Sequence, residues 1–390
     1  MKIINIISSK PKLLVLYILG FLFAFTSSIP AYVNSSFLES LTNAQLVGVI
    51  YSVGSILTLV TLILIPKILK KYGNYKVATV FAIAYLLNFL SLAFSSNIIF
   101  IIFSFLISGA IATIIYFSLD IFIEHNSSDI KTGRIRGIYL TCINLAWLVS
   151  PWLAGIIVDE SFYRRIYFVV ALMLIPVIFI ILFNLRNFKD PEYKYVSVID
   201  TIKSFNVNKN IKNIWISSYL LQFFFACMVV YLPIYLNQHI GFDWVTIGLM
   251  FSIALIPFVL VQIPLGCWAD KKVGEKEILV AGFLIMAIFT FIIPYITNNN
   301  FIIWTAILFM TRVGAAMVEV MNDTYFFKNV EDKNINLINL YRTASPLSYT
   351  TAPLAVTILI YFIPLGSIFY LLGLLMFLGV KVCFSLKDTK

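Results

Sequence analysis

Long apolar stretches follow one another almost without pause from Leu13 to Leu386. Each can cross a bilayer, which takes about 20 apolar residues because every backbone N–H and C=O in the hydrocarbon must be paired within its own segment. Charged residues collect in the gaps between them. The sequence predicts twelve membrane-spanning helices, near residues 13–34, 45–66, 77–94, 98–122, 137–159, 166–186, 213–236, 244–265, 277–296, 302–327, 343–365 and 367–386.

The composition excludes a soluble protein, because 61% of the residues are hydrophobic and only 12% are charged, where a soluble surface needs about a quarter. No Gly-rich phosphate loop, nucleophile elbow or metal-binding helix motif is present, so ATP-driven pumping and hydrolysis lack their necessary groups. We therefore expect no enzyme, no cofactor and no metal. The residues weighed for a metal site are isolated: Cys142, Cys227, Cys267, Cys383, His125 and His239.

The positions of lysine and arginine predict the orientation, since cytoplasmic loops retain them. Of the 28 basic residues, all but Arg164, Arg165 and Arg312 lie on one side when both termini are placed inside. We expect a multi-pass protein of a prokaryotic inner membrane with cytoplasmic termini. The formal charge of +10 then reflects topology and attraction to anionic lipid headgroups, and we expect no nucleic-acid partner.

The chain divides into two halves at its longest polar gap. We predict a six-helix bundle over 1–187, a cytoplasmic linker over 188–212 and a second six-helix bundle over 213–390. An internal repeat supports this division, because Gly73 precedes Pro151 by 78 residues and Gly274 precedes Pro353 by 79. The expected fold is an all-α membrane protein of two pseudo-symmetric bundles, the organisation of alternating-access transporters.

Small residues surround both of these prolines and let helices approach closely. A packing seam is favoured here over contact with a ligand. The two patterns are Ala146-x-x-x-Ser150-Pro151-x-x-Ala154-Gly155 in the first half and Ser348-x-x-x-Ala352-Pro353 in the second.

The gap after the eighth span reads Gly266-Cys267-Trp268-Ala269-Asp270-Lys271-Lys272-Val273-Gly274-Glu275-Lys276. It resembles the signature Gly-x-x-x-Asp-(Arg/Lys)-x-Gly-(Arg/Lys)-(Arg/Lys) of the major facilitator superfamily, with one extra residue before Gly274. The resemblance implies that Asp270, with Lys271 and Gly274, belongs to a cytoplasmic gate. In the family this aspartate caps a helix of the opposite half, where an anion is favoured by the helix dipole.

Two departures from the family pattern stand out. In the loop after the second span, Pro66 replaces the glycine and Lys70 replaces the aspartate. The fifth span is similar to a pattern associated with antiporters, but Ala146, Ser150 and Ala154 replace three of its glycines.

Charged residues within spans are costly and mark functional sites. Arg312 lies near mid-membrane, and Glu319 and Asp323 follow on the same helical face. We expect Glu319 to carry the coupling proton with Arg312 as its electrostatic partner; the alternative is a fixed ion pair. Asp120, Glu124, Asp323 and Arg342 are expected to be gate or anchoring charges. Uncharged candidates for the substrate site are Asn144, Gln222, Trp147 and Tyr231.

The sequence thus predicts a monomeric secondary active transporter of a small molecule that works by alternating access between its halves. Proton-coupled export of an amphipathic compound, by antiport, is the favoured form. Proton-coupled uptake of a sugar, nucleoside or other metabolite is the alternative. From a different class, the chain is a non-transporting sensor or scaffold on a transporter fold.

The predicted topology can be tested by labelling single cysteines in intact cells. Cysteines at Ser96 and Asn299 should react with a membrane-impermeant thiol reagent from outside, and one at Ser128 only after permeabilisation. Labelling at Ser128 without permeabilisation would reverse the orientation.

Overall fold

The structure is a computed structural model that describes residues 11–125, 132–158, 163–190, 209–260, 274–329 and 335–387. All regular secondary structure in these described residues is helical, and no strand occurs among them. Ten helices in this part of the chain are long and apolar enough to cross a membrane. A further apolar helix, α12 (Trp244–Leu260), is shorter. The prediction of an all-α membrane protein is confirmed.

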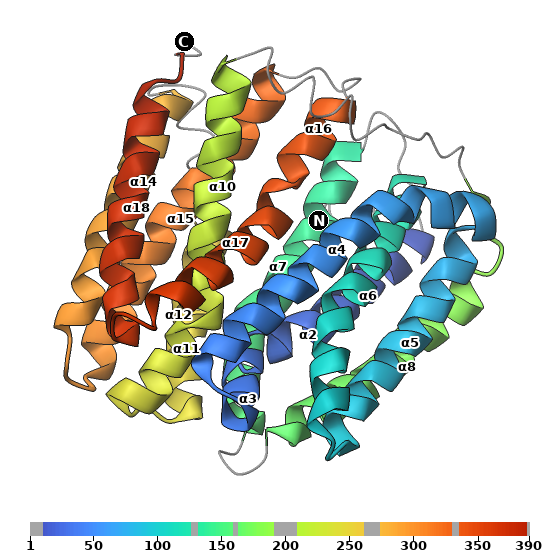
Figure 1. Ribbon diagram of the computed structural model, residues 1–390. Helices are drawn as coiled ribbons and strands as arrows, with labels where there is room; N and C mark the ends of the chain where they lie inside the picture. The colour runs from blue at the N-terminus through green and yellow to red at the C-terminus, as the bar shows by residue number, and fades with distance from the viewer. Residues whose placement is uncertain are drawn as a thin grey trace. The chain divides into compact units, whose positions relative to one another are not determined.

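The chain forms two compact units. The first comprises described residues of Met1–Val33 and Leu57–Tyr195, and the second those of Asn34–Ile56 and Val196–Lys390. Helices of the first unit are α2 (Pro11–Ala31), α5 (Asn74–Phe94), α6 (Ile98–His125), α7 (Thr132–Ile157) and α8 (Arg164–Asn184), with most of α4 (Ala44–Tyr72) (Figure 1). Those of the second are α3 (Asn34–Leu41), α10 (Lys209–Val230), α11 (Leu232–Ile234), η1 (Tyr235–Ile240), α12, α14 (Glu275–Ile292), η3 (Ile293–Tyr295), α15 (Phe301–Asn329), α16 (Ile335–Arg342), α17 (Ala344–Leu359), η4 (Leu365–Ser367) and α18 (Ile368–Phe384).

In the first unit, α2 packs on α7 and α8, and α5 packs on α6 and α8. Small hydroxyl side chains join α2 to α7, because the Oγ atoms of Ser28 and Ser150 lie 2.6 Å apart. Ser150 also donates to the carbonyl of Ala146 at 2.6 Å. Both serines are fully buried, and these bonds satisfy their hydroxyls within the protein.

The loop predicted after the second span is largely helical. Helix α4 continues through Pro66 to Tyr72, which leaves only Gly73 between α4 and α5. The backbone turns there with φ 80°, which favours glycine. The backbone N–H of Asn74 donates to Asp190 Oδ1 at 2.7 Å. A carboxylate distant in sequence therefore caps the start of α5.

In the second unit, α14 packs against α15 and α18, while α10 packs against α17, α18 and α15 (Figure 1). The predicted span 213–236 begins earlier, at Lys209, and its regular helix ends at Val230. Pro233 follows within α11, and the chain then enters the π-helix η1. Proline lacks an N–H and disturbs the preceding turn, which accounts for the break at Tyr231.

Residues 34–56 pack within the second unit although they belong to the first half of the sequence. A Cβ on Gly48 would lie 1.9 Å from Thr357 Oγ1 and 2.8 Å from the carbonyl oxygen of Pro353, so this close approach requires glycine. Thr357 donates to the carbonyl of Gln45 at 3.2 Å.

Glu39 of α3 lies in the short segment that connects the first two apolar spans. It accepts a hydrogen bond from Gln238 of η1 at 2.7 Å. Burial raises the pKa of Glu39 to about 7, and the bond from Gln238 opposes this increase. Glu39 is therefore a carboxyl that gains a proton near neutral pH.

The eleventh predicted span, 343–365, is too long at its C-terminal end. Helix α17 ends at Leu359, and the N–H groups of Phe362 and Ile363 both bond the Leu359 carbonyl in a turn. Pro364 follows and cannot extend the helix, because it has no N–H to donate.

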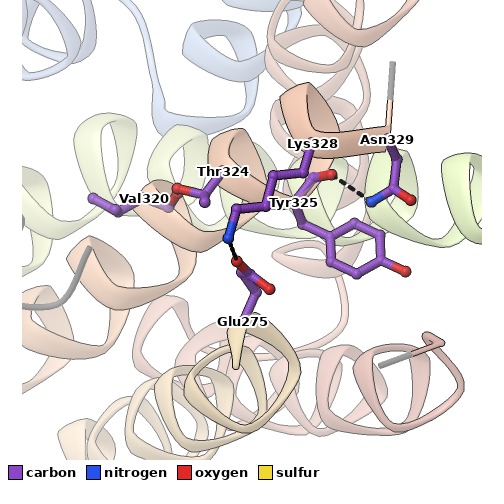
Figure 2. A network of polar contacts seen from close by, with 6 residues as sticks. All are labelled: Glu275, Val320, Thr324, Tyr325, Lys328 and Asn329. Atoms are coloured by element: carbon purple, nitrogen blue, oxygen red, sulfur yellow. Dashed lines mark hydrogen bonds and ion pairs between the residues drawn. The ribbon is translucent and has the colours of Figure 1, made fainter. Parts of the chain in front are cut away.

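An ion pair with one buried partner joins the start of α14 to the end of α15 (Figure 2). Lys328 Nζ lies 2.5 Å from Glu275 Oε1, with Glu275 1% exposed and Lys328 43% exposed. Glu275 is the first residue of α14 and follows Gly274, whose φ is 88°. Its negative charge is favoured at a helix N-terminus, and Lys328 neutralises it.

We expect Lys328→Met to lower the free energy of unfolding by about 1–3 kcal/mol, because it leaves the Glu275 carboxylate buried without this partner. Thermal unfolding in detergent measures the loss. Adding Glu275→Gln should recover much of it, and Lys381→Met, at an exposed position of α18, should have little effect. Equal stability of the Lys328 and Lys381 variants would contradict the role of the pair.

Candidate functional site

A polar cavity of about 240 Å³ opens within the second unit. Helices α10, α15, α16 and the start of α17 surround it. Its lining is Ser218, Leu221, Gln222, Glu319, Asn322, Asp323, Tyr341, Arg342, Ala344 and Ser345. Amide, hydroxyl, carboxylate and guanidinium groups therefore meet in one space inside a largely apolar chain.

Helical spacing explains how this lining arises. On α15, Glu319, Asn322 and Asp323 stand at positions i, i+3 and i+4, so they share one face. The cavity-lining residues of α10, from Ser218 to Gln222, follow the same spacing. Two polar helix faces thus line one cavity.

Hydrogen bonds fix part of this lining. Tyr341 donates its hydroxyl to Asp323 Oδ1 at 2.8 Å. The Tyr341 ring stacks on Phe326, with centroids 4.2 Å apart and an interplanar angle of 16°. Helix α16 is therefore held against α15 on the side of the cavity where Asp323 lies.

Glu319 lies one turn before Asp323, and both carboxyl groups belong to the cavity lining. Two negative charges at this spacing repel each other, so protonation of one relieves the repulsion. A cavity that holds two carboxyls and a nearby arginine can exchange protons and can attract a cationic group.

Arg312 is 5% exposed on α15, two turns before Glu319. Its guanidinium carbon lies 5.5 Å from the ring centroid of Phe224 and 5.6 Å from that of Phe225. Such cation–π contacts stabilise a desolvated arginine. The described lining of the cavity does not include Arg312, so its pairing with Glu319 stays a prediction.

The structure separates the other substrate candidates. Gln222 lines the cavity together with Glu319. Asn144 and Trp147 lie half-buried on α7 of the first unit. Tyr231 lies in the second unit at the break after α10, where its hydroxyl donates to the carbonyl of Pro353 at 3.1 Å.

The gate candidates are placed only in part. Asp323 and Arg342 line the same cavity, Asp120 is half-buried on α6, and Gly274 precedes α14. The side chain of Glu124, and Asp270 and Lys271 altogether, lie outside the described residues. The proposed contact of Asp270 with the fifth span therefore stays a prediction.

Residues of the two proline motifs are buried against neighbouring helices. Ser348 donates to the carbonyl of Tyr219 on α10 at 2.8 Å, as Ser150 contacts Ser28 on α2. Each motif thus has one serine hydroxyl that bonds a partner helix, at a different position relative to its proline. The buried members are Ala146, Ser150, Pro151, Ala154, Gly155, Ser348, Ala352 and Pro353.

Asn322, Ser218 and Tyr341 were not expected in the site. Neutral polar residues in an apolar span carry little signal, because they often bond their own helix. The available signal for Asn322 was its spacing of three from Glu319, which places both on one face. Among the described residues, no group of three or more His, Cys, Asp or Glu side chains is arranged to hold a metal.

Comparison with protein-family models identifies one family. The model of the Major Facilitator Superfamily matches residues 14–258 and again 214–390. No curated protein matches the sequence.

Three solved structures share the fold at low sequence identity. A D-xylose-proton symporter has a TM-score of 0.76 and 14% identity, covering 96% of this chain and 97% of its own. The nucleoside transporter NupG (D323A mutant) has a TM-score of 0.76 and 12% identity, with coverages of 96% and 99%. A bacterial homologue of the human lysosomal transporter Spinster, in an inward-facing and occupied conformation, has a TM-score of 0.74 and 11% identity, covering 95% of each chain.

The Tyr341–Asp323 bond can be tested by Tyr341→Phe. This change removes the donor to a carboxylate and should lower the free energy of unfolding by about 1–2 kcal/mol. Tyr361→Phe is the matched control, because Tyr361 is 70% exposed. Thermal unfolding in detergent that gives the same midpoint for both variants would show that the bond contributes nothing.

Proposed function

Because the chain belongs to the Major Facilitator Superfamily of transporters, we propose that it couples a proton gradient to the movement of a small hydrophilic molecule. The substrate binds in the polar cavity between α10 and α15, and the likeness to a D-xylose-proton symporter favours uptake as the direction. The proton gradient supplies the energy for transport, since the sequence carries no nucleotide-binding motif.

The observation that carries this proposal is the chemistry of the cavity. Gln222, Asn322 and Ser218 offer amide and hydroxyl groups at one site, and such groups recognise the hydroxyl and carbonyl oxygens of a sugar or nucleoside. A few convergent polar groups in an otherwise apolar setting are typical of small-molecule sites. The likeness to a D-xylose-proton symporter and to a nucleoside transporter agrees with this substrate class.

Glu319 supplies the proton-binding group in this mechanism. It lines the same cavity as the amide and hydroxyl groups proposed to bind the substrate, and it lies one helical turn from Asp323. A conformational change that alters its surroundings changes the free energy of its charged form. Proton release and substrate release then occur from the same cavity.

Export of an amphipathic cation is the second candidate, and the two carboxyl groups of the cavity favour it. A lipophilic cation would be held by charge at Glu319 and Asp323. It would leave the amide and hydroxyl groups of the cavity without acceptors or donors, which is unfavourable in a buried site. The hydrophilic substrate accounts for more of the lining.

The proposal also covers the orientation in the membrane and the cytoplasmic gate. We place the chain as a monomer in the inner membrane with cytoplasmic termini, from the distribution of lysine and arginine. We also propose that Asp270, which lies outside the described residues, is a cytoplasmic gate residue. Asp120 and Glu124 are anchoring charges at the corresponding end of the fourth span.

Glu319→Gln tests the coupling in proteoliposomes. Accumulation of D-xylose or uridine driven by a pH gradient should fall to the level of empty liposomes, because glutamine cannot bind the proton. Exchange of labelled for unlabelled substrate, which needs no net proton movement, should persist. Glu277→Gln is the control, since Glu277 is an exposed carboxylate of α14.

Accumulation by Glu319→Gln as strong as that of the parent protein would place the coupling group elsewhere, with Asp120 and Asp323 next to examine. Transport of tetraphenylphosphonium in place of D-xylose and uridine would establish the second candidate.

A further inference from the structure

Asn322 has an unused hydrogen-bond donor at the cavity. The residue is 1% exposed and belongs to the cavity lining. Its Nδ2 atom is buried and has no hydrogen-bond partner among the described residues. An unpaired buried donor lowers the stability of the folded protein. A ligand that accepts a hydrogen bond from Asn322 would remove this cost.

The orientation of the Asn322 amide is set by a chain of hydrogen bonds from two other helices. Ser217 Oγ on α10 donates to Asn322 Oδ1 at 2.6 Å. Cys383 Sγ on α18 donates to Ser217 Oγ at 3.7 Å, which directs the hydroxyl hydrogen of Ser217 towards Asn322. The carbonyl arm of the amide is thus occupied, and the NH₂ arm is unpaired among the described residues.

A second asparagine on the same helix shows the contrast. Asn329 donates its Nδ2 to the carbonyl of Tyr325 at 2.8 Å (Figure 2), so its donor is satisfied within α15. Asn322 does not bond its own helix in this way, since the side chain is drawn to Ser217 instead.

We propose that Asn322 is a specificity-determining residue, whose Nδ2 donates to a hydroxyl or carbonyl oxygen of the substrate and is held in position by Ser217 and Cys383. The proposal rests on the proposed function, because it assigns a substrate contact in the same cavity. Ser217 and Cys383 are positioning residues, since they act through the amide of Asn322.

The assignment limits the substrate class. A molecule with an oxygen acceptor satisfies the Nδ2 donor, whereas a hydrocarbon or a lipophilic cation without an acceptor leaves it unpaired and is disfavoured. The carboxyl of Glu319 lies on the same face of α15, so the substrate contact and the proposed proton site are one helical turn apart.

Asn322→Leu is the direct test, with purified full-length protein in detergent and labelled D-xylose and uridine as probes. Loss of the donor should weaken binding of both by about tenfold or more. Tetraphenylphosphonium has no hydrogen-bond acceptor, so its binding should not weaken. Ser217→Ala should weaken binding of D-xylose and uridine less, because the amide of Asn322 is then free to rotate but keeps its donor.

A stability measurement separates this role from a structural one. The double variant Ser217→Ala/Asn322→Leu removes the hydrogen bond together with the unpaired donor. The ligand-free protein should then keep or raise its melting temperature while it loses binding of both probes. Asn329→Leu is the control and should lower the melting temperature but leave probe binding unchanged.

Parent-like binding of D-xylose and uridine by Asn322→Leu would overturn the inference, and the proposed coupling would still stand if Glu319→Gln abolishes accumulation. A parent protein that binds neither probe would overturn the inference and the proposed substrate class together. Loss of binding in Asn329→Leu equal to that in Asn322→Leu would also overturn it, because the effect would then not depend on the cavity.

Discussion

A polar group inside a bilayer has to find its hydrogen-bond partner within the protein, and this constraint governs the structure. Ser28 and Ser150 satisfy each other between α2 and α7, and Ser348 bonds the carbonyl of Tyr219 on α10. At the helix break after α10, the hydroxyl of Tyr231 likewise bonds the carbonyl of Pro353 on α17. Polar side chains within the apolar helices are thus tolerated where a neighbouring helix supplies a hydrogen-bond partner.

The same constraint gives meaning to a buried donor that has no partner among the described residues. Asn322 is held by Ser217 on one side and has an unpaired donor on the other. Glu319 and Asp323 bring two carboxyls to the same cavity. Charged groups within membrane spans are costly, and in the proposed function these carboxyls serve ligand and proton binding.

The sequence predicts the helical architecture because apolar length is a strong signal, but it predicts helix ends poorly. Helix α4 continues past Pro66 to Tyr72, and α17 stops at Leu359, since the ends depend on turns and on partners from other helices. In the site, the burial cost of charge pointed to Glu319, whereas Asn322 and Tyr341 became visible only once α15, α10 and α16 were placed. The cap of α5 by Asp190 joins residues too distant in sequence for any local pattern to reveal.

The internal repeat preserves backbone geometry while its chemistry differs between the copies. Gly73 and Gly274 have φ of 80° and 88°, and each precedes a helix. An acidic group stands at both helix starts, where the dipole favours negative charge. In α5 this group is Asp190, brought from a distant part of the chain, and in α14 it is Glu275 itself, neutralised by Lys328. Both copies of the repeat thus have an acidic group at this helix start, but it comes from a different part of the chain in each.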